Sequence, residues 1–155
     1  MMTRMRRARV AAVLLAVLVP AGCGSGPTFS SGRLEIETST GIVRLQVQIA
    51  DTDRARRVGL QHRRRLAPGA GMAFVFDRPT TAGFWMKDTL IPLDIAYWSQ
   101  GGRVVAILHM TPCRGDPCPL YVPGHPYVGA VEANRGFFGQ HWVAPGDIVR
   151  LTRSS

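Results

Sequence analysis

The sequence predicts a single, mainly β domain, folded as a sandwich or a partly open barrel with one amphipathic helix. Three observations indicate this class: short segments alternate apolar and polar residues, turns rich in Gly and Pro separate them, and only one segment has helical spacing. With 46% apolar and 19% charged residues, the chain is neither disordered nor a coiled coil. We expect the domain to occupy residues 33–153.

Two strands open the predicted domain. In residues 33–38, Leu34 and Ile36 alternate with glutamates, which is the period of a half-buried strand. Residues 42–49 repeat this pattern, with valine, leucine and isoleucine on the inward face. Because Ser-Thr-Gly separates the two segments, they are predicted to form a β hairpin.

The helix is predicted at about residues 52–60. Asp51 or Thr52 can cap its N-terminus, and Ala55 lies on its apolar side. Arginines occupy the other sides and continue beyond the helix, at Arg54, Arg56, Arg57, Arg63, Arg64 and Arg65. We interpret them as a solvated surface with one or two buried ion pairs, for which Arg57 is the best candidate. The alternative is attraction to anionic lipid headgroups or wall polymers.

The remaining strands are predicted where apolar or alternating stretches lie between turns. They comprise residues 72–76, 84–86, 93–98, 103–110, 127–133 and 148–151. The two stretches that flank the turn Ser-Gln-Gly-Gly form a second predicted hairpin. Five of the eleven prolines lie in residues 111–126, which excludes a regular strand there. Residues 136–142 are expected to form a turn or a short helix.

The N-terminus has the three-part pattern of a secretory signal peptide. Four arginines precede an apolar run at residues 10–19, which is too short to span a bilayer, and Ala21-Gly22-Cys23 follows it. This boundary resembles the lipobox of bacterial lipoproteins. It predicts removal of residues 1–22, lipidation of Cys23 and a flexible tether at residues 23–32. The alternative is an ordinary cleaved signal peptide with an incidental cysteine.

These features also indicate where the protein is located and which classes of partner it can have. We expect the protein to be exported and anchored to the outer face of the cytoplasmic membrane by its lipid. No nucleic-acid partner is expected, because the four signal-peptide arginines supply nearly half of the formal net charge of +9. The sequence does not define the oligomeric state.

Cys113 and Cys118 lie in the proline-rich segment and are predicted to form a disulfide bond. Two nearby thiols normally oxidise outside the cytosol, and the intervening Gly and Pro allow a tight reversal of the chain. The alternative is a redox or metal pair. The four-residue spacing differs from the two-residue spacing of thioredoxin-like motifs.

Several sequence motifs resemble a known family. The first comprises Arg57-Val58-Gly59-Leu60, Arg63, Leu66, Gly71-Met72 and Phe74-Val75-Phe76, and the second is Phe84-Trp85-Met86-Lys87-Asp88-Thr89-Leu90-Ile91-Pro92-Leu93-Asp94. Together with later matches that end at Pro145-Gly146-Asp147, they are similar to the bacterial and archaeal family called domain of unknown function 192. The resemblance covers roughly residues 42–151. It implies a compact, mainly β fold that is often exported or lipid-anchored, and it brings no established activity.

The second motif is also the place where we expect a binding site. If residues 84–87 alternate as in a strand, Trp85 and Lys87 share one face, and Asp94 follows a bend and can complement Lys87. The sequence therefore predicts a shallow site formed by Trp85, Lys87 and Asp94. The alternative is an ion pair within the scaffold.

The leading functional interpretation is a binding or accessory module of the cell envelope, for a glycan, a wall polymer or an envelope protein. The alternative is an enzyme that acts on an extracytoplasmic substrate through Lys87, Asp94 and Glu132. The sequence contains no recognised hydrolase or metalloprotease motif, so no catalytic residue is assigned. No metal site or cofactor is expected.

Overall fold

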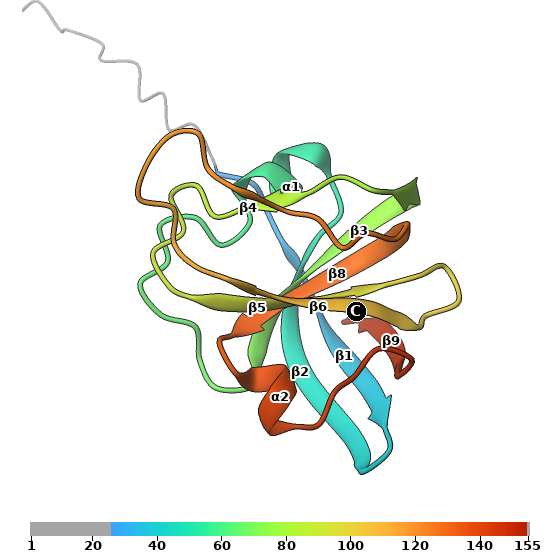
Figure 1. Ribbon diagram of the computed structural model, residues 1–155. Helices are drawn as coiled ribbons and strands as arrows, with labels where there is room; N and C mark the ends of the chain where they lie inside the picture. Colours follow the sequence, from blue (N-terminus) through green and yellow to red (C-terminus); the bar gives the residue numbers. More distant parts are fainter. Residues whose placement is uncertain (1–25, 155) are drawn as a thin grey trace, which may run out of the picture.

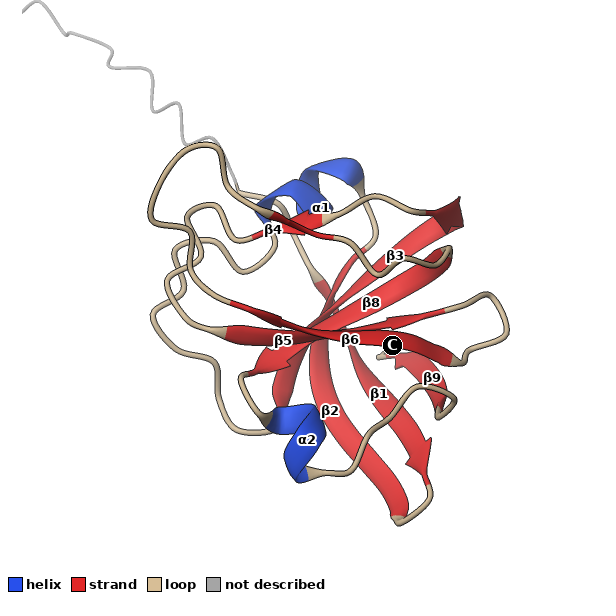
Figure 2. Cartoon of the chain, in the orientation of Figure 1, coloured by secondary structure: helices blue, strands red, loops and turns tan. Residues whose placement is uncertain are grey.

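The computed structural model describes residues 26–154, and the predicted signal peptide and Cys23 lie outside them. Within this part of the chain, nine strands and two short helices confirm the mainly β class (Figures 1 and 2). The elements are β1 (Ser30–Thr38), β2 (Gly41–Ala50), α1 (Asp53–Val58), β3 (Ala70–Thr80), β4 (Phe84–Trp85), β5 (Leu93–Trp98), β6 (Val104–Met110), β7 (Leu120–Tyr121), β8 (Tyr127–Asn134), α2 (Phe137–Gln140) and β9 (Ile148–Arg153).

Seven strands form one curved sheet in the order β6-β5-β8-β3-β2-β1-β9. Its two edge strands meet at one end, where the amide of Val104 donates to the carbonyl of Asp147 at 2.8 Å and the amide of Val149 donates to Gly102 at 2.7 Å. The sheet therefore forms a partly open barrel. Both predicted hairpins, β1–β2 and β5–β6, are present as antiparallel pairs.

Helix α1 connects two parallel strands, β2 and β3, an arrangement that the sequence did not predict. The hydroxyl of Thr52 caps the helix by accepting a hydrogen bond from the amide of Ala55 at 3.1 Å. The helix ends at Val58 because Gly59 has a φ of +48°, and a Cβ there would lie 3.3 Å from the ring of Phe74. This close approach fixes α1 against β3.

The sheet has an apolar cluster on each face. One includes Leu34, Leu45, Val131 and Trp98 and fills the barrel interior, as strand alternation predicts. The other is built on Met72, Phe74, Ile95 and Tyr97 and lies under α1 and the separate two-stranded sheet β4–β7. Figure 1 shows α1 and β4 on the same side of the large sheet. This outer layer, rather than the barrel interior, carries the candidate site.

The proline-rich segment contains only the two-residue strand β7, as its composition predicts. Cys113 and Cys118 are paired in it, and their Cα atoms are 5.6 Å apart, within the range that a disulfide bond requires. No helix within residues 26–154 is both long enough and apolar enough to cross a membrane.

Candidate functional site

The β4–β7 sheet presents Trp85 to the outside. Phe84 pairs with Tyr121 and points inward, where its ring packs edge to face against two others. The distance between ring centroids is 4.8 Å to Phe74 and 5.6 Å to Tyr97. Trp85 pairs with Leu120, and 46% of its surface is exposed.

The predicted alternation continues past the end of β4. Met86 is fully buried, whereas Lys87 is exposed. The ammonium group of Lys87 lies 5.9 Å from the centre of the Trp85 ring, within the distance of a cation–π contact. The structure therefore brings Trp85 and Lys87 together, as the sequence predicts. Lys87 is also the only lysine in the 155-residue sequence.

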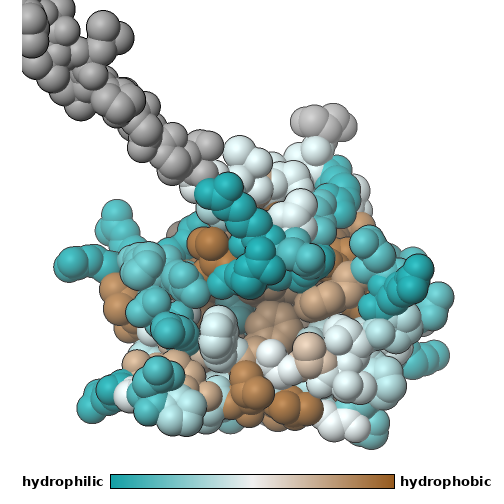
Figure 3. Space-filling model, turned by 90° about the horizontal axis from the view of Figure 1, so that it is seen from above, coloured by the Kyte–Doolittle hydropathy of each residue, from teal (hydrophilic) through white to brown (hydrophobic). Residues whose placement is uncertain are grey.

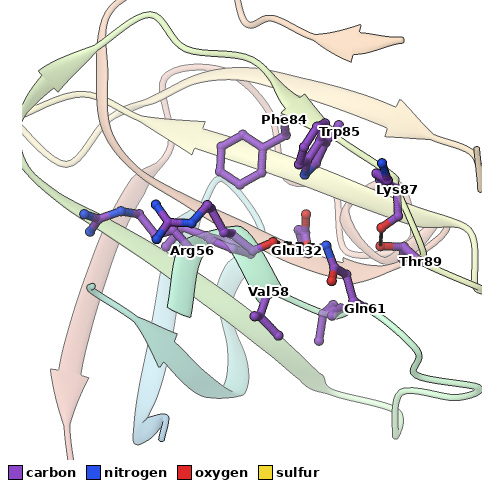
Figure 4. Close-up of a pocket in the computed structure, with 12 residues that line it drawn as sticks. Arg56, Val58, Gln61, Phe84, Trp85, Lys87, Thr89 and Glu132 are labelled. Atoms are coloured by element: carbon purple, nitrogen blue, oxygen red, sulfur yellow. Dashed lines mark hydrogen bonds between the residues drawn. The ribbon is translucent and has the colours of Figure 1, made fainter. Parts of the chain in front are cut away.

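A small pocket, with a cavity volume of about 30 Å³, opens between Trp85 and the helix. Its lining comes from α1 and the turn after it, β3, the β4 motif and β8, and comprises Arg56, Arg57, Val58, Gly59, Leu60, Gln61, Phe74, Phe84, Trp85, Lys87, Thr89 and Glu132. Figure 4 shows the carboxyl group of Glu132 in the space bounded by Phe84, Trp85 and Gln61. The pocket thus has an aromatic wall and one acid at its back.

Glu132 is the most unusual group in the pocket. It is only 4% exposed, and its carboxyl group has no hydrogen bond or ion pair with any residue of the described chain. Burial raises its pKa to about 8, because the carboxylate loses most of its hydration in the folded protein. At neutral pH the group is therefore mostly a neutral acid that can donate a hydrogen bond.

The polar groups beside Glu132 have partners of their own. The side-chain amide of Gln61 donates to the carbonyl of Arg57 at 3.1 Å, and the hydroxyl of Thr89 donates to the carbonyl of Lys87 at 3.5 Å. Both contacts fix the wall of the pocket. They leave the acceptor oxygen of the Gln61 amide without a hydrogen bond within residues 26–154.

The two arginines of the pocket differ in their contacts. Arg56 is held in place: its guanidinium donates to the carbonyls of Asp51 and Val75 at 2.8 and 2.5 Å and to the carboxylate of Asp53 at 2.6 Å. It also lies 4.8 Å from the centre of the Phe76 ring. Arg57 is exposed, and its side chain forms no ion pair within the described chain. The buried ion pair predicted for Arg57 is therefore wrong for the described chain: the ion pair on α1 joins Arg56 to the exposed Asp53 one turn away on the same helix.

A wider groove of about 350 Å³ adjoins the pocket and shares four lining residues with it. Its lining comprises Asp53, Arg56, Arg57, Phe76, Ala82, Gly83, Phe84, Trp85, Leu120 and Tyr127. Leu120 is 62% exposed, and its Cβ packs so closely on Gly83 that a Cβ at Gly83 would lie 3.0 Å from it. Figure 3 shows the molecule from this side, with apolar surface in a hollow between hydrophilic groups.

Asp94 does not line this pocket, so the predicted trio of Trp85, Lys87 and Asp94 is not assembled. Asp94 is fully buried elsewhere and accepts hydrogen bonds from Nδ1 of His109 at 2.6 Å and from the amide of Gly136 at 2.8 Å. The expected partnership with Lys87 is therefore replaced by contacts to β6 and to the turn before α2.

The alternative enzyme site also is not assembled as predicted. Of Lys87, Asp94 and Glu132, only Lys87 and Glu132 line the same pocket. The binding site predicted from sequence omitted Glu132. The available indication was a single acid within the otherwise apolar stretch of residues 127–133. Within residues 26–154, no group of three or more His, Cys, Asp or Glu side chains is placed to hold a metal ion.

Fold and site together define a partly open β barrel with a polar pocket under a two-stranded cap on its outer face. The chain belongs to the family of domain of unknown function 192, described as an uncharacterized ACR, whose model matches residues 35–151. A comparison with curated proteins found no match.

The solved structures that are similar to this chain include proteins from two organisms. One, from Sinorhizobium meliloti 1021, is provisionally described as a transcription regulator. It has 27% sequence identity and a TM-score of 0.75, and the match covers 82% of this chain and 98% of that one. The other is a protein of unknown function from Novosphingobium aromaticivorans DSM 12444. It has 28% sequence identity and a TM-score of 0.71, and the match covers 76% of this chain and 83% of that one. These matches support the fold and the family and assign no ligand.

Proposed function

We propose that this protein is an exported, lipid-anchored binding module of the cell envelope, and that the pocket and groove beside Trp85 hold a glycan or wall polymer. One observation carries this proposal. A half-exposed tryptophan, with the chain's only lysine beside its ring, stands at the mouth of a pocket whose back is a buried carboxyl group without a hydrogen-bond partner among residues 26–154.

The apolar surface supports a binding role. Trp85 and Leu120 lie opposite each other on the two strands of the cap, so both side chains project from its outer face. Exposed apolar surface of this kind is unfavourable in water unless a ligand or a partner covers it. The flat ring of a tryptophan matches the apolar face of a sugar ring.

The polar groups provide specificity. Binding sites typically combine apolar walls with a few polar groups that fix the ligand's orientation. Here Glu132 lies at the back of the pocket, and Arg57 and Lys87 lie at its rim. A ligand with hydroxyl or acidic groups on an apolar frame satisfies both requirements, and saccharides have this chemistry.

The proposal is tested with the full-length, lipidated protein isolated from its own envelope. Trp85→Ala and Lys87→Ala are each expected to reduce capture of an envelope glycan at least tenfold, with a melting temperature close to that of the wild type. Trp142→Ala is the matched control, because Trp142 is 73% exposed and does not line the pocket or the groove.

Three results would overturn the proposal. Capture of glycan by both pocket variants at the wild-type level would show that the site lies elsewhere. Specific capture of an envelope protein in place of glycan would show that the partner is a protein. Release of glycan fragments that depends on Glu132 would favour the enzyme.

A further inference from the structure

Two exposed cations and one buried acid lie at opposite ends of the same narrow pocket. Arg57 and Lys87 are exposed at its rim, and Glu132 is buried at its back. We propose that the pocket recognises the carboxylate of an acidic glycan: Arg57 and Lys87 pair with its negative charge, and protonated Glu132 donates a hydrogen bond to one of its oxygens. This inference rests on the proposed function and specifies its ligand.

The surroundings of Glu132 favour its protonated form. From β3, the groups packed on this side are Met72 and Phe74, which carry no charge. From β5, the facing titratable group is Tyr97, whose hydroxyl donates to the carbonyl of Tyr121 at 2.9 Å and whose pKa is raised by burial. The cations come from α1 and from the motif after β4, and within residues 26–154 neither forms a hydrogen bond or an ion pair with Glu132. A buried carboxyl group without a countercharge remains neutral.

The size of the pocket limits what can reach Glu132. A water-sized group needs roughly 10–15 Å³ of cavity, so the volume of about 30 Å³ admits about two such groups. The two oxygens of a carboxylate meet this limit, whereas a sugar ring does not. The hydrogen bond from a carboxylic acid to a carboxylate is short and strong, because the acceptor is charged.

The body of the ligand then lies in the adjoining groove. This groove has a volume of about 350 Å³ and shares Arg57, Phe84 and Trp85 with the pocket. A sugar ring can rest against Trp85 while an acidic substituent enters the pocket between Arg57 and Lys87. This arrangement requires the carboxylate to project from the ring on a short arm.

The experiment measures calorimetric affinities of the full-length protein in detergent for two tetrasaccharides. One alternates N-acetylglucosamine with N-acetylmuramic acid and carries lactyl carboxylates, and the other is chitotetraose, which has the same backbone without them. At pH 6.5 the acidic tetrasaccharide is expected to bind at least tenfold more tightly. Arg57→Gln and Lys87→Gln are expected to abolish this preference, and both positions are exposed, so the fold should tolerate the changes.

The role of Glu132 is tested through pH. Above pH 8, affinity for the acidic tetrasaccharide should fall about tenfold per pH unit as Glu132 loses its proton. In Glu132→Gln the amide still donates, so binding should persist and this fall should disappear. The same fall with pH in Glu132→Gln, or equal affinity for both sugars, would overturn the inference and leave the glycan-binding proposal intact. If neither sugar binds and the envelope capture also fails, both proposals are wrong.

Discussion

Asp94 and Glu132 lie on adjacent strands of the large sheet, and their side chains point to opposite faces of it. Glu132 on β8 pairs with Ile95 on β5, whereas Asp94 pairs with Ala133. Paired residues share a face, and consecutive residues alternate. Glu132 therefore lies on the side of α1 and β4, and Asp94 lies on the side of Ala133. This register gives two buried acids separate roles.

Asp94→Ala is expected to destabilise the domain by about 3 kcal/mol, because it leaves the amide of Gly136 without its acceptor and removes the hydrogen bond between the buried carboxyl group and His109. Urea unfolding measures this change. Asp77→Ala, at an exposed position on β3, is the control and should lie within about 0.5 kcal/mol of the wild type. Loss of glycan binding in folded Asp94→Ala would contradict the assignment of Asp94 to the scaffold.

The free energy of unfolding should depend on pH through Glu132. Its pKa is raised from 4.5 to about 8 in the folded protein, so the folded state holds a proton that the unfolded state has released. The wild type should therefore lose stability relative to Glu132→Gln as pH rises from about 4.5 to 8, by at most about 1.4 kcal/mol per pH unit. Above about pH 8, the difference in unfolding free energy between the two proteins should be constant. Urea unfolding of both proteins across this range measures the difference. A constant difference throughout would show that Glu132 is ionised in the fold.

The disulfide between Cys113 and Cys118 should stabilise the segment that leads into β7. Replacing both cysteines by serine is expected to lower stability by about 2 kcal/mol, since the bond closes a small ring in the unfolded chain. Non-reducing peptide mapping should find the two residues linked. Complete alkylation of both thiols in native, unreduced protein would contradict the pairing.

The lipid anchor at Cys23 remains a prediction, because this residue lies outside the described part of the chain. Intact mass of membrane-extracted protein should show a diacylglyceryl group on a chain that begins at Cys23. Cys23→Ser should release the domain from the membrane fraction without changing its melting temperature. A wild-type product cut at another residue would contradict the prediction.

The sequence by itself determined most of the local structure. Alternation located both hairpins, Asp51 or Thr52 marked the start of α1, and the prolines excluded long strands from residues 111–126. It also placed Trp85 and Lys87 on the exposed side and Met86 in the core. These features depend on neighbouring residues and on the two-residue period of a strand, which can be read from the chain directly.

Only the tertiary structure decided how distant segments meet. Strand alternation near Glu132 does not reveal which face of β8 carries the pocket, because that depends on its register with β5, about forty residues away in the chain. The parallel pairing of β2 with β3 likewise turned Arg56 toward the carbonyl of Val75 and left Arg57 at the rim. A one-residue change of register would exchange the faces of Asp94 and Glu132, so the sheet as a whole determines which acid enters the site.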